Sequence, residues 1–376
     1  MGEPPRLPQR TSRVPYCCQE RAGWRVRKHS GSLRRYFRAN RERTREPTTV
    51  VLRIYDRMSG LLHPDNRLFA LARQDRRPPS ALVAIAIVFV TVVLAIIPGQ
   101  LLGRIVLFSP GGIPRFRSGI QSIVEPIVLN VTVFLFVYLG LWVWLRVSSK
   151  RPFWTLGLER QHAVQRALRG VVIAGLMMAA TVGLSVVPGA SLAPGLAQTM
   201  GIAAFGIRFL SLLSYCVQGP AEEALFRGWL LPVVGARYRP WIGVMVSSAI
   251  FSLAHALSRG ITVLGFLNLF LFGVFASIYA LAEGGLWGIG AWHAVWNWTI
   301  GDLLGFSLDG SPHVGLFSSI HAEGPEIISG GAFGLEGGLA CTAVFLVAIG
   351  VVVILSRRFG DDRPLIAAIC STITHS

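Results

Sequence analysis

Residues 339–356 read LACTAVFLVAIGVVVILS, an apolar run that contains no charged side chain. A helix needs about 20 mostly apolar residues to cross a bilayer core roughly 30 Å thick, so this run is long enough to span a membrane alone. Similar runs recur through most of the chain. The predicted spans are 81–103, 125–146, 168–188, 202–220, 241–257, 262–282, 286–304 and 339–356. We therefore predict an all-α fold, a polytopic transmembrane helix bundle with about eight spans in the cell membrane.

Composition excludes an ordinary soluble domain, because 52% of the 376 residues are hydrophobic and the mean hydropathy is +0.54. The net charge of +17 could indicate a nucleic-acid partner. Most of that charge lies in residues 1–80, which lack zinc-ligand spacing and any long helical period. A basic flank before a first span is typical of a cytoplasmic segment that faces anionic lipid. We expect a lipid bilayer as partner and no nucleic acid.

The distribution of basic residues predicts the orientation, because cytoplasmic loops of membrane proteins are enriched in Lys and Arg. With the N-terminus inside, eight spans place most basic loop residues in the cytoplasm. These are Arg146, Lys150, Arg151, Arg160, Arg166, Arg169, Arg237, Arg239, Arg357, Arg358 and Arg363. The opposite side receives Arg104, Arg115, Arg117 and Arg259. Residues 305–338 lie outside in this scheme and contain no Lys or Arg. Both termini are therefore predicted to be cytoplasmic.

Three segments are expected along the chain. Residues 1–78 form a basic N-terminal extension, Arg-rich and without an apolar face, for which disorder is predicted. Residues 79–358 form the membrane domain, and 359–376 form a short C-terminal tail. The sequence from Met58 onward resembles a normal translation start, which leaves open whether synthesis begins at Met1 or at Met58.

Ionisable residues inside a span cost about 2.5–3.5 kcal/mol each at the helix centre, so they indicate function. The first such group is Glu222-Glu223-Ala224-Leu225-Phe226-Arg227. On a helix Glu223 and Arg227 are four residues apart and can form an ion pair, whereas Glu222 points about 100° away and lacks a local cation. Both glutamates could instead sit at the cytoplasmic interface. The apolar sequence that continues to Val234 argues against that alternative.

Two further groups lie on other spans. Phe251 is followed four residues later by His255, and His293 is followed four residues later by Asn297. A lone histidine is more often a hydrogen-bonded packing residue, and the second pair could be a structural bond between helices. Together the three groups supply a carboxylate, two imidazoles and a carboxamide. A buried hydrolytic site needs these parts: a general base, a proton-transfer group and donors for an oxyanion.

These residues resemble the hallmarks of the CPBP (Abi) family of intramembrane proteases, which have been regarded both as metalloproteases and as glutamate proteases. The family includes the Ras-converting CAAX prenyl endopeptidases and bacteriocin-processing or immunity proteins. Its Glu-Glu-x-x-x-Arg, Phe-x-x-x-His and His-x-x-x-Asn motifs occur here in order, over about 200–305. Gly273 and Ser277 lie between the last two motifs and resemble the family's small-residue helix, which would permit close packing.

The resemblance implies an endopeptidase in which Glu222 is the general base, assisted by His255. It also implies that His293 and Asn297 stabilise the oxyanion. Glu223 and Arg227 would be the structural pair. The substrate would be a peptide or protein associated with the membrane, and no cofactor is expected.

Three alternatives remain open. Glu222, His255 and His293 are residue types that can bind zinc, although no His-Glu-x-x-His helix is present. A non-catalytic membrane immunity or scaffold protein could retain the fold without cleavage. A transporter could use buried Glu and His as proton relays, but we detect no inverted repeat.

The depth of the proposed site is the main geometric question. In straight helices Glu222 lies towards the cytoplasmic side, whereas His255 ends its span nearer the outer face. We expect a break at Gly219-Pro220, or helix tilt, to bring them to similar depth.

Overall fold

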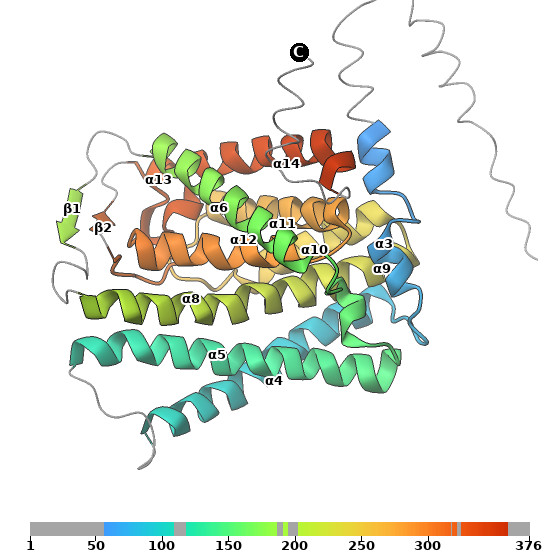
Figure 1. Cartoon of the computed structure of the whole chain (residues 1–376), viewed down its shortest axis with the longest axis horizontal. Coiled ribbons are helices and arrows are strands. Elements are labelled where there is room, and N and C mark those ends of the chain that lie inside the picture. Colours follow the sequence, from blue (N-terminus) through green and yellow to red (C-terminus); the bar gives the residue numbers. More distant parts are fainter. Residues whose placement is uncertain are drawn as a thin grey trace, which may run out of the picture. The chain divides into compact units, whose positions relative to one another are not determined.

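The computed structural model describes residues 56–108, 118–185, 191–194, 202–316, 318–321 and 325–359 (Figure 1). The predicted extension up to residue 55 and the tail from residue 360 lie outside these ranges. The α-helices are α3 (Arg67–Ala72), α4 (Ala81–Phe108), α5 (Ser118–Trp144), α6 (Ala163–Ser185), α8 (Ile202–Glu223), α9 (Leu231–Arg237), α10 (Pro240–Ala254), α11 (Val263–Glu283), α12 (Trp287–Trp298), α13 (Glu326–Ser329) and α14 (Leu339–Phe359). The all-α prediction is confirmed; strands β1 (Ser191–Pro194) and β2 (Ser318–His321) add a short antiparallel pair.

Helix α12 is surrounded by other helices. It packs against α6, α8 and α11, while α11 also contacts α10 and α14. Helix α5 connects the bundle to α4, because it packs against both α8 and α4. In Figure 1, α3 and α9 lie at one end of the helices and the β1–β2 pair lies at the other.

Five helices are long and apolar enough to cross a membrane. They are Ala81–Phe108, Val124–Ser149, Ala163–Ser185, Val263–Glu283 and Leu339–Ser356. Much of their apolar surface stays exposed; Leu82 and Ile97 of α4, for example, are 80% and 67% exposed. Lipid is the environment in which such a surface is stable, and the chain is a multi-pass membrane protein. Helices also occupy the other three predicted spans, but the count of eight and the cytoplasmic termini stay predictions.

Glycines stand where helix axes approach most closely. A Cβ on Gly99 of α4 would lie 2.5 Å from the Val133 backbone of α5, and one on Gly170 of α6 would meet the Gly288 carbonyl of α12. On α11, a Cβ on Gly273 would lie 2.7 Å from the Ser248 backbone of α10. Small residues allow backbones to pack closely where no hydrophobic effect drives helices together. These close contacts join α4 to α5, α6 to α12 and α11 to α10.

The expected break at Gly219-Pro220 does not occur. Helix α8 runs through both residues, continues as the π-helix η4 (Ala224–Leu230) and then as α9. Glu222 therefore lies near the middle of one long helical column. A missing proline N–H is tolerated in a membrane helix when neighbours satisfy the freed carbonyl groups. Helical structure continues beyond residue 220, where the predicted span ended, so Glu222 lies inside the column and not at its end.

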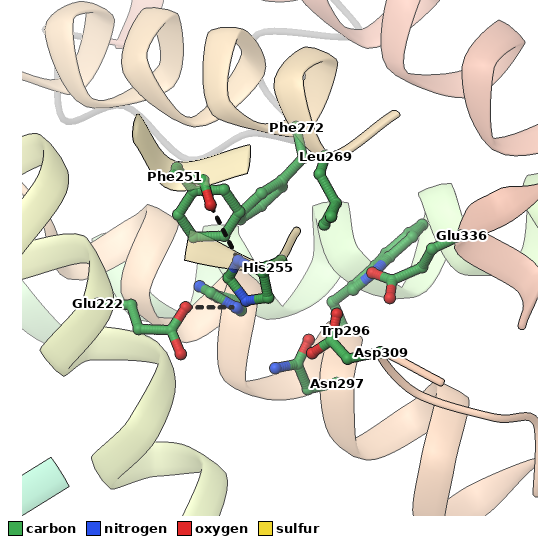
Figure 2. A pocket seen from close by; sticks show the side chains of 10 residues that line it. Glu222, Phe251, His255, Leu269, Phe272, Trp296, Asn297, Asp309 and Glu336 are labelled. Carbon is green, nitrogen blue, oxygen red and sulfur yellow. Dashed lines mark hydrogen bonds and ion pairs between the residues drawn. The ribbon is translucent and has the colours of Figure 1, made fainter. Parts of the chain in front are cut away.

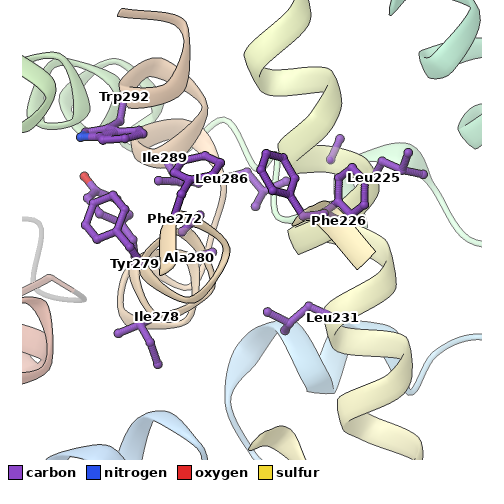
Figure 3. Close-up of a cluster of buried hydrophobic side chains, with 14 of the residues drawn as sticks. Leu225, Phe226, Leu231, Phe272, Ile278, Tyr279, Ala280, Leu286, Ile289 and Trp292 are labelled. Carbon is purple, nitrogen blue, oxygen red and sulfur yellow. The ribbon is translucent and has the colours of Figure 1, made fainter. Parts of the chain in front are cut away.

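A large hydrophobic core surrounds this column (Figure 3). Phe226 and Leu231 contribute from η4 and α9, while Phe272 and Trp292 contribute from α11 and α12. The packed region begins before the predicted boundary at residue 79, because α3 buries Leu68 and Phe69. A Cβ on Gly235 of α9 would lie 2.4 Å from the Phe69 ring, so α3 packs tightly on α9. This helix has only six residues, too few to be detected beside the arginines of the flanking sequence.

Candidate active site

The first motif lies at the junction of α8 and η4. Glu223 and Arg227 are both 0% exposed, and the Arg227 guanidinium donates to Glu223 Oε1 at 3.0 Å. The guanidinium carbon also lies 4.4 Å from the centre of the Phe251 ring, within range of a cation–π contact. A buried charge requires such partners, because removing it from water is costly. The pair fixes the start of a π-helix, a local geometry that recurs at functional sites.

Glu223 also holds the histidine of the third motif. His293 Nδ1 lies 2.8 Å from Glu223 Oε1, so this nitrogen donates its hydrogen to the carboxylate. His293 Nε2 then faces the neighbouring carboxylate, at 3.9 Å from Glu222 Oε2. The contact depends on Gly219, where a Cβ would lie 2.8 Å from the backbone nitrogen of Ala294. The absence of a side chain lets α8 and α12 meet next to both motifs.

The second motif contributes its histidine from the end of α10. His255 is the C-cap residue of that helix, and its Nδ1 lies 2.9 Å from the Phe251 carbonyl oxygen. Because a carbonyl only accepts, Nδ1 carries the hydrogen. His255 Nε2 is consequently the ring nitrogen left for other partners, and the side chain lines the pocket described next.

One pocket brings the motif residues together (Figure 2). Glu222, His255, His293 and Asn297 all line it, and Glu222 and Asn297 are only 8% and 4% exposed. The pocket has room for about one water molecule. Side chains from α8, α10 and α12 therefore converge on a common centre.

Two carboxylates in this pocket were not expected from the sequence. Asp309 and Glu336 both come from the long segment between α12 and α14. The Trp296 indole N–H donates to Glu336 Oε1 at 2.9 Å, and Asn268 donates to the Glu336 backbone carbonyl at 2.7 Å. Neither acid is three or four residues from a motif residue, so helical spacing could not have linked it to the site. The one sequence signal for these acids was their occurrence in a segment that contains no Lys or Arg.

The environment of Glu336 favours its neutral form. Glu336 lies in the short 3-10 turn η7 (Leu335–Gly337), outside the membrane-spanning helices. Burial, assisted by the negative charge of Asp309, raises the pKa of Glu336 from 4.5 to about 7. At neutral pH this carboxyl is therefore close to its titration midpoint.

The same segment is anchored to α8 on another side. Arg208 of α8 is 5% exposed, and its guanidinium donates to the Asp302 carboxylate and to the Val314 carbonyl oxygen. His313 Nδ1 lies 3.4 Å from the same Asp302 oxygen. This buried ion pair attaches residues 302–314 to the helix that carries Glu222.

Glu222, His255 and His293 are the residue types considered above as zinc ligands. Within the part of the chain that the structure describes, no three His, Cys, Asp or Glu side chains are arranged to hold one. Glu222, His255 and His293 share a pocket, but they do not form such a group.

A buried Glu, two His and an Asn that meet inside a helical membrane bundle mark a candidate functional site. Residues 204–299, which contain all three motifs, match the protein family described as type II CAAX prenyl endopeptidase Rce1-like. The match confirms, for this segment, the resemblance to the CPBP and CAAX-protease family inferred from the motifs.

A curated relative also matches part of the chain. An uncharacterized 24.3 kDa protein of Escherichia coli is 36% identical over 80 residues, which are 20% of this chain and 36% of the relative. The match therefore spans about a third of the relative's length. No solved structure matches the chain.

Proposed function

We propose that this chain is an intramembrane endopeptidase that hydrolyses a peptide bond with a water activated by Glu222. The observation that carries the proposal is the position of the Glu222 carboxylate. It is almost fully buried, 3.9 Å from His293 Nε2, in a pocket with room for about one water. A water between these groups would be hydrogen-bonded and polarised by the carboxylate.

The chemistry follows from the donors and acceptors around the pocket. Glu222 takes a proton from the water, and the water oxygen attacks the peptide carbonyl carbon. The Asn297 side-chain amide donates to the oxyanion, His293 Nε2 donates to it when the ring is doubly protonated, and His255 Nε2 helps to orient the water. The C–N bond then breaks as Glu222 returns its proton to the leaving nitrogen. The second proton of the water stays on the attacking oxygen, so the products are a carboxylic acid and an amine, and the glutamate regains its starting state.

Glu223 prepares this site without taking part in bond changes. Its bond to His293 Nδ1 keeps the other ring nitrogen directed at Glu222. Arg227 balances the charge that Glu223 brings into the membrane interior. The two residues therefore orient a functional imidazole as well as stabilise the helix.

The substrate class proposed is a peptide or protein associated with the bilayer. A prenylated CAAX-type terminus agrees with the description of the matched family, and a bacteriocin-type peptide precursor is the other candidate. No metal is required by this mechanism.

The test is a comparison of protein termini, by mass spectrometry, in membranes of cells producing wild type or Glu222→Gln at equal levels. We expect a set of termini present only with the wild type and insensitive to strong chelators. Identical termini in both strains would support a non-catalytic scaffold or immunity protein instead. Loss of the termini on chelation, with recovery on adding zinc, would establish the zinc alternative.

A further inference from the structure

A line of polar side chains runs from the site into the lipid-facing part of the bundle. Ser214, Gln218 and Glu222 stand four residues apart on α8, so they follow one stripe of the helix. Asn130 lies on α5 beside this stripe, near the middle of the helix and within a candidate membrane span. Polar residues in a span are costly unless they bond with one another, and they indicate function.

The hydrogen bonds along this line have a fixed direction. The Asn130 amide nitrogen donates to Ser214 Oγ at 2.8 Å and to Gln218 Oε1 at 3.1 Å. Gln218 Nε2 then donates to Glu222 Oε1 at 3.2 Å. If the Gln218 amide were reversed, its oxygen would face the carboxylate and its nitrogen would face the Asn130 donor. Because the carboxylate only accepts, the Gln218 nitrogen must face Glu222, and Asn130 then donates to the Gln218 oxygen and holds that amide in place.

The consequence is a carboxylate with two different oxygens. Glu222 Oε1 is occupied by Gln218, whereas Oε2 is directed at His293. A free carboxylate could rotate and present either oxygen or neither to the water. The bond from Gln218 removes this freedom and leaves one oxygen for the chemistry.

We infer that Gln218 and Asn130 are positioning residues that hold the Glu222 carboxylate in its working orientation, with Asn130 acting through Gln218. This inference rests on the proposed function, because it assigns a role in the same reaction. Neither residue belongs to the three motifs, and Asn130 lies outside the matched segment 204–299.

The test uses the purified protein in lipid nanodiscs. The probe is a synthetic peptide that spans a cleavage site found only in wild-type membranes. We expect Gln218→Leu to lower kcat by about 10–100-fold with KM changed less than twofold, since misplacement of a reacting group affects the chemical step. Asn130→Leu should lower kcat by about three- to tenfold, and it should have no further effect in the Gln218→Leu background. A purely structural role would give effects that multiply.

The control is Thr132→Val on α5, which removes a hydroxyl bonded only within its own helix. Its kcat should equal that of the wild type. The inference is overturned if Gln218→Leu keeps kcat within twofold, or if the two effects multiply, while Glu222→Gln is inactive. If Glu222→Gln cleaves at the wild-type rate, or if the wild type cleaves nothing, the proposed function fails and this inference fails with it.

Discussion

Glu223 accepts two hydrogen bonds on a single oxygen, one from Arg227 and one from His293. Stability and function therefore depend on the same carboxylate. The requirements of stability and of function can be separated. Stability needs no unpaired buried charge, so the ion pair must be either complete or absent. The orientation of His293, in contrast, needs the carboxylate itself.

Removing one member of this pair leaves an isolated buried charge, which costs about 3–5 kcal/mol in protein interiors. We expect Arg227→Met to lower the melting temperature strongly in detergent. The double variant Glu223→Leu/Arg227→Met should recover most of that loss but stay inactive, because His293 Nδ1 has lost its acceptor. A double variant that is as unstable as Arg227→Met, or as active as wild type, would contradict this account.

Glu336 gives the fold a pH dependence of defined sign. Its pKa is raised from 4.5 to about 7, so the folded state favours the protonated carboxyl. This contribution is fully favourable below about pH 4.5 and declines as the pH rises to about 7, while the unfolded chain is already ionised. We expect the melting temperature of wild type to fall more between pH 5 and pH 8 than that of Glu336→Gln. Glu326→Gln, an exposed acid of the same segment, should behave as wild type; equal pH slopes for wild type and Glu336→Gln would disprove the assignment.

At the scale of elements, the close crossing of α8 and α12 sets the distance between base and histidine. A methyl group on Gly219 would lie 2.8 Å from a backbone nitrogen that cannot rotate away. A displacement of about 1 Å at a reacting group can cost about 100-fold in rate. The packing of two helix backbones is therefore part of the site.

We expect Gly219→Ala to reduce peptide cleavage at least tenfold, because it separates Glu222 from His293. The matched change is Gly206→Ala on the same helix, where nothing lies within 4 Å of the added methyl group. That variant should retain wild-type activity and should be no less stable. Full activity of Gly219→Ala in the same assay would show that the crossing does not control the site.

Sequence reasoning predicted the helices and the motifs well. Apolar runs, and polar residues spaced four positions apart, are local signals that a sequence shows directly. Because sequence reasoning ended the fourth span at residue 220, it needed a helix break or tilt to bring Glu222 and His255 to similar depth. The π-helix η4, which extends that span into one long column, has no simple sequence signature. Glu336 reaches the pocket through an irregular segment, and such contacts depend on tertiary packing rather than on periodicity.

Across the whole molecule, α9, which ends at Arg237, and α13 of the pocket segment lie at opposite ends of the helices (Figure 1). Lys150 follows α5 and Arg237 ends α9, whereas Asp309 and Glu336 come from the segment after α12. The positive-inside rule then predicts that the segment covering the pocket is extracytoplasmic.

This orientation can be measured by cysteine labelling in cells, starting from a cysteine-free variant. We expect a cysteine at Val314, which is 48% exposed, to react with a membrane-impermeant maleimide in intact cells. A cysteine at the exposed Lys150 should react only after permeabilisation. The reverse pattern would invert the topology without affecting the geometry of the site.

The central claim is that a water held by Glu222 becomes part of the product. The direct measurement is cleavage, in ¹⁸O-labelled water, of a peptide spanning a wild-type-specific site, by reconstituted wild type and Glu222→Gln. We predict one ¹⁸O atom in the new C-terminal carboxylate with wild type, and no product with Glu222→Gln. Release of the same labelled product by Glu222→Gln at the wild-type rate would contradict the account.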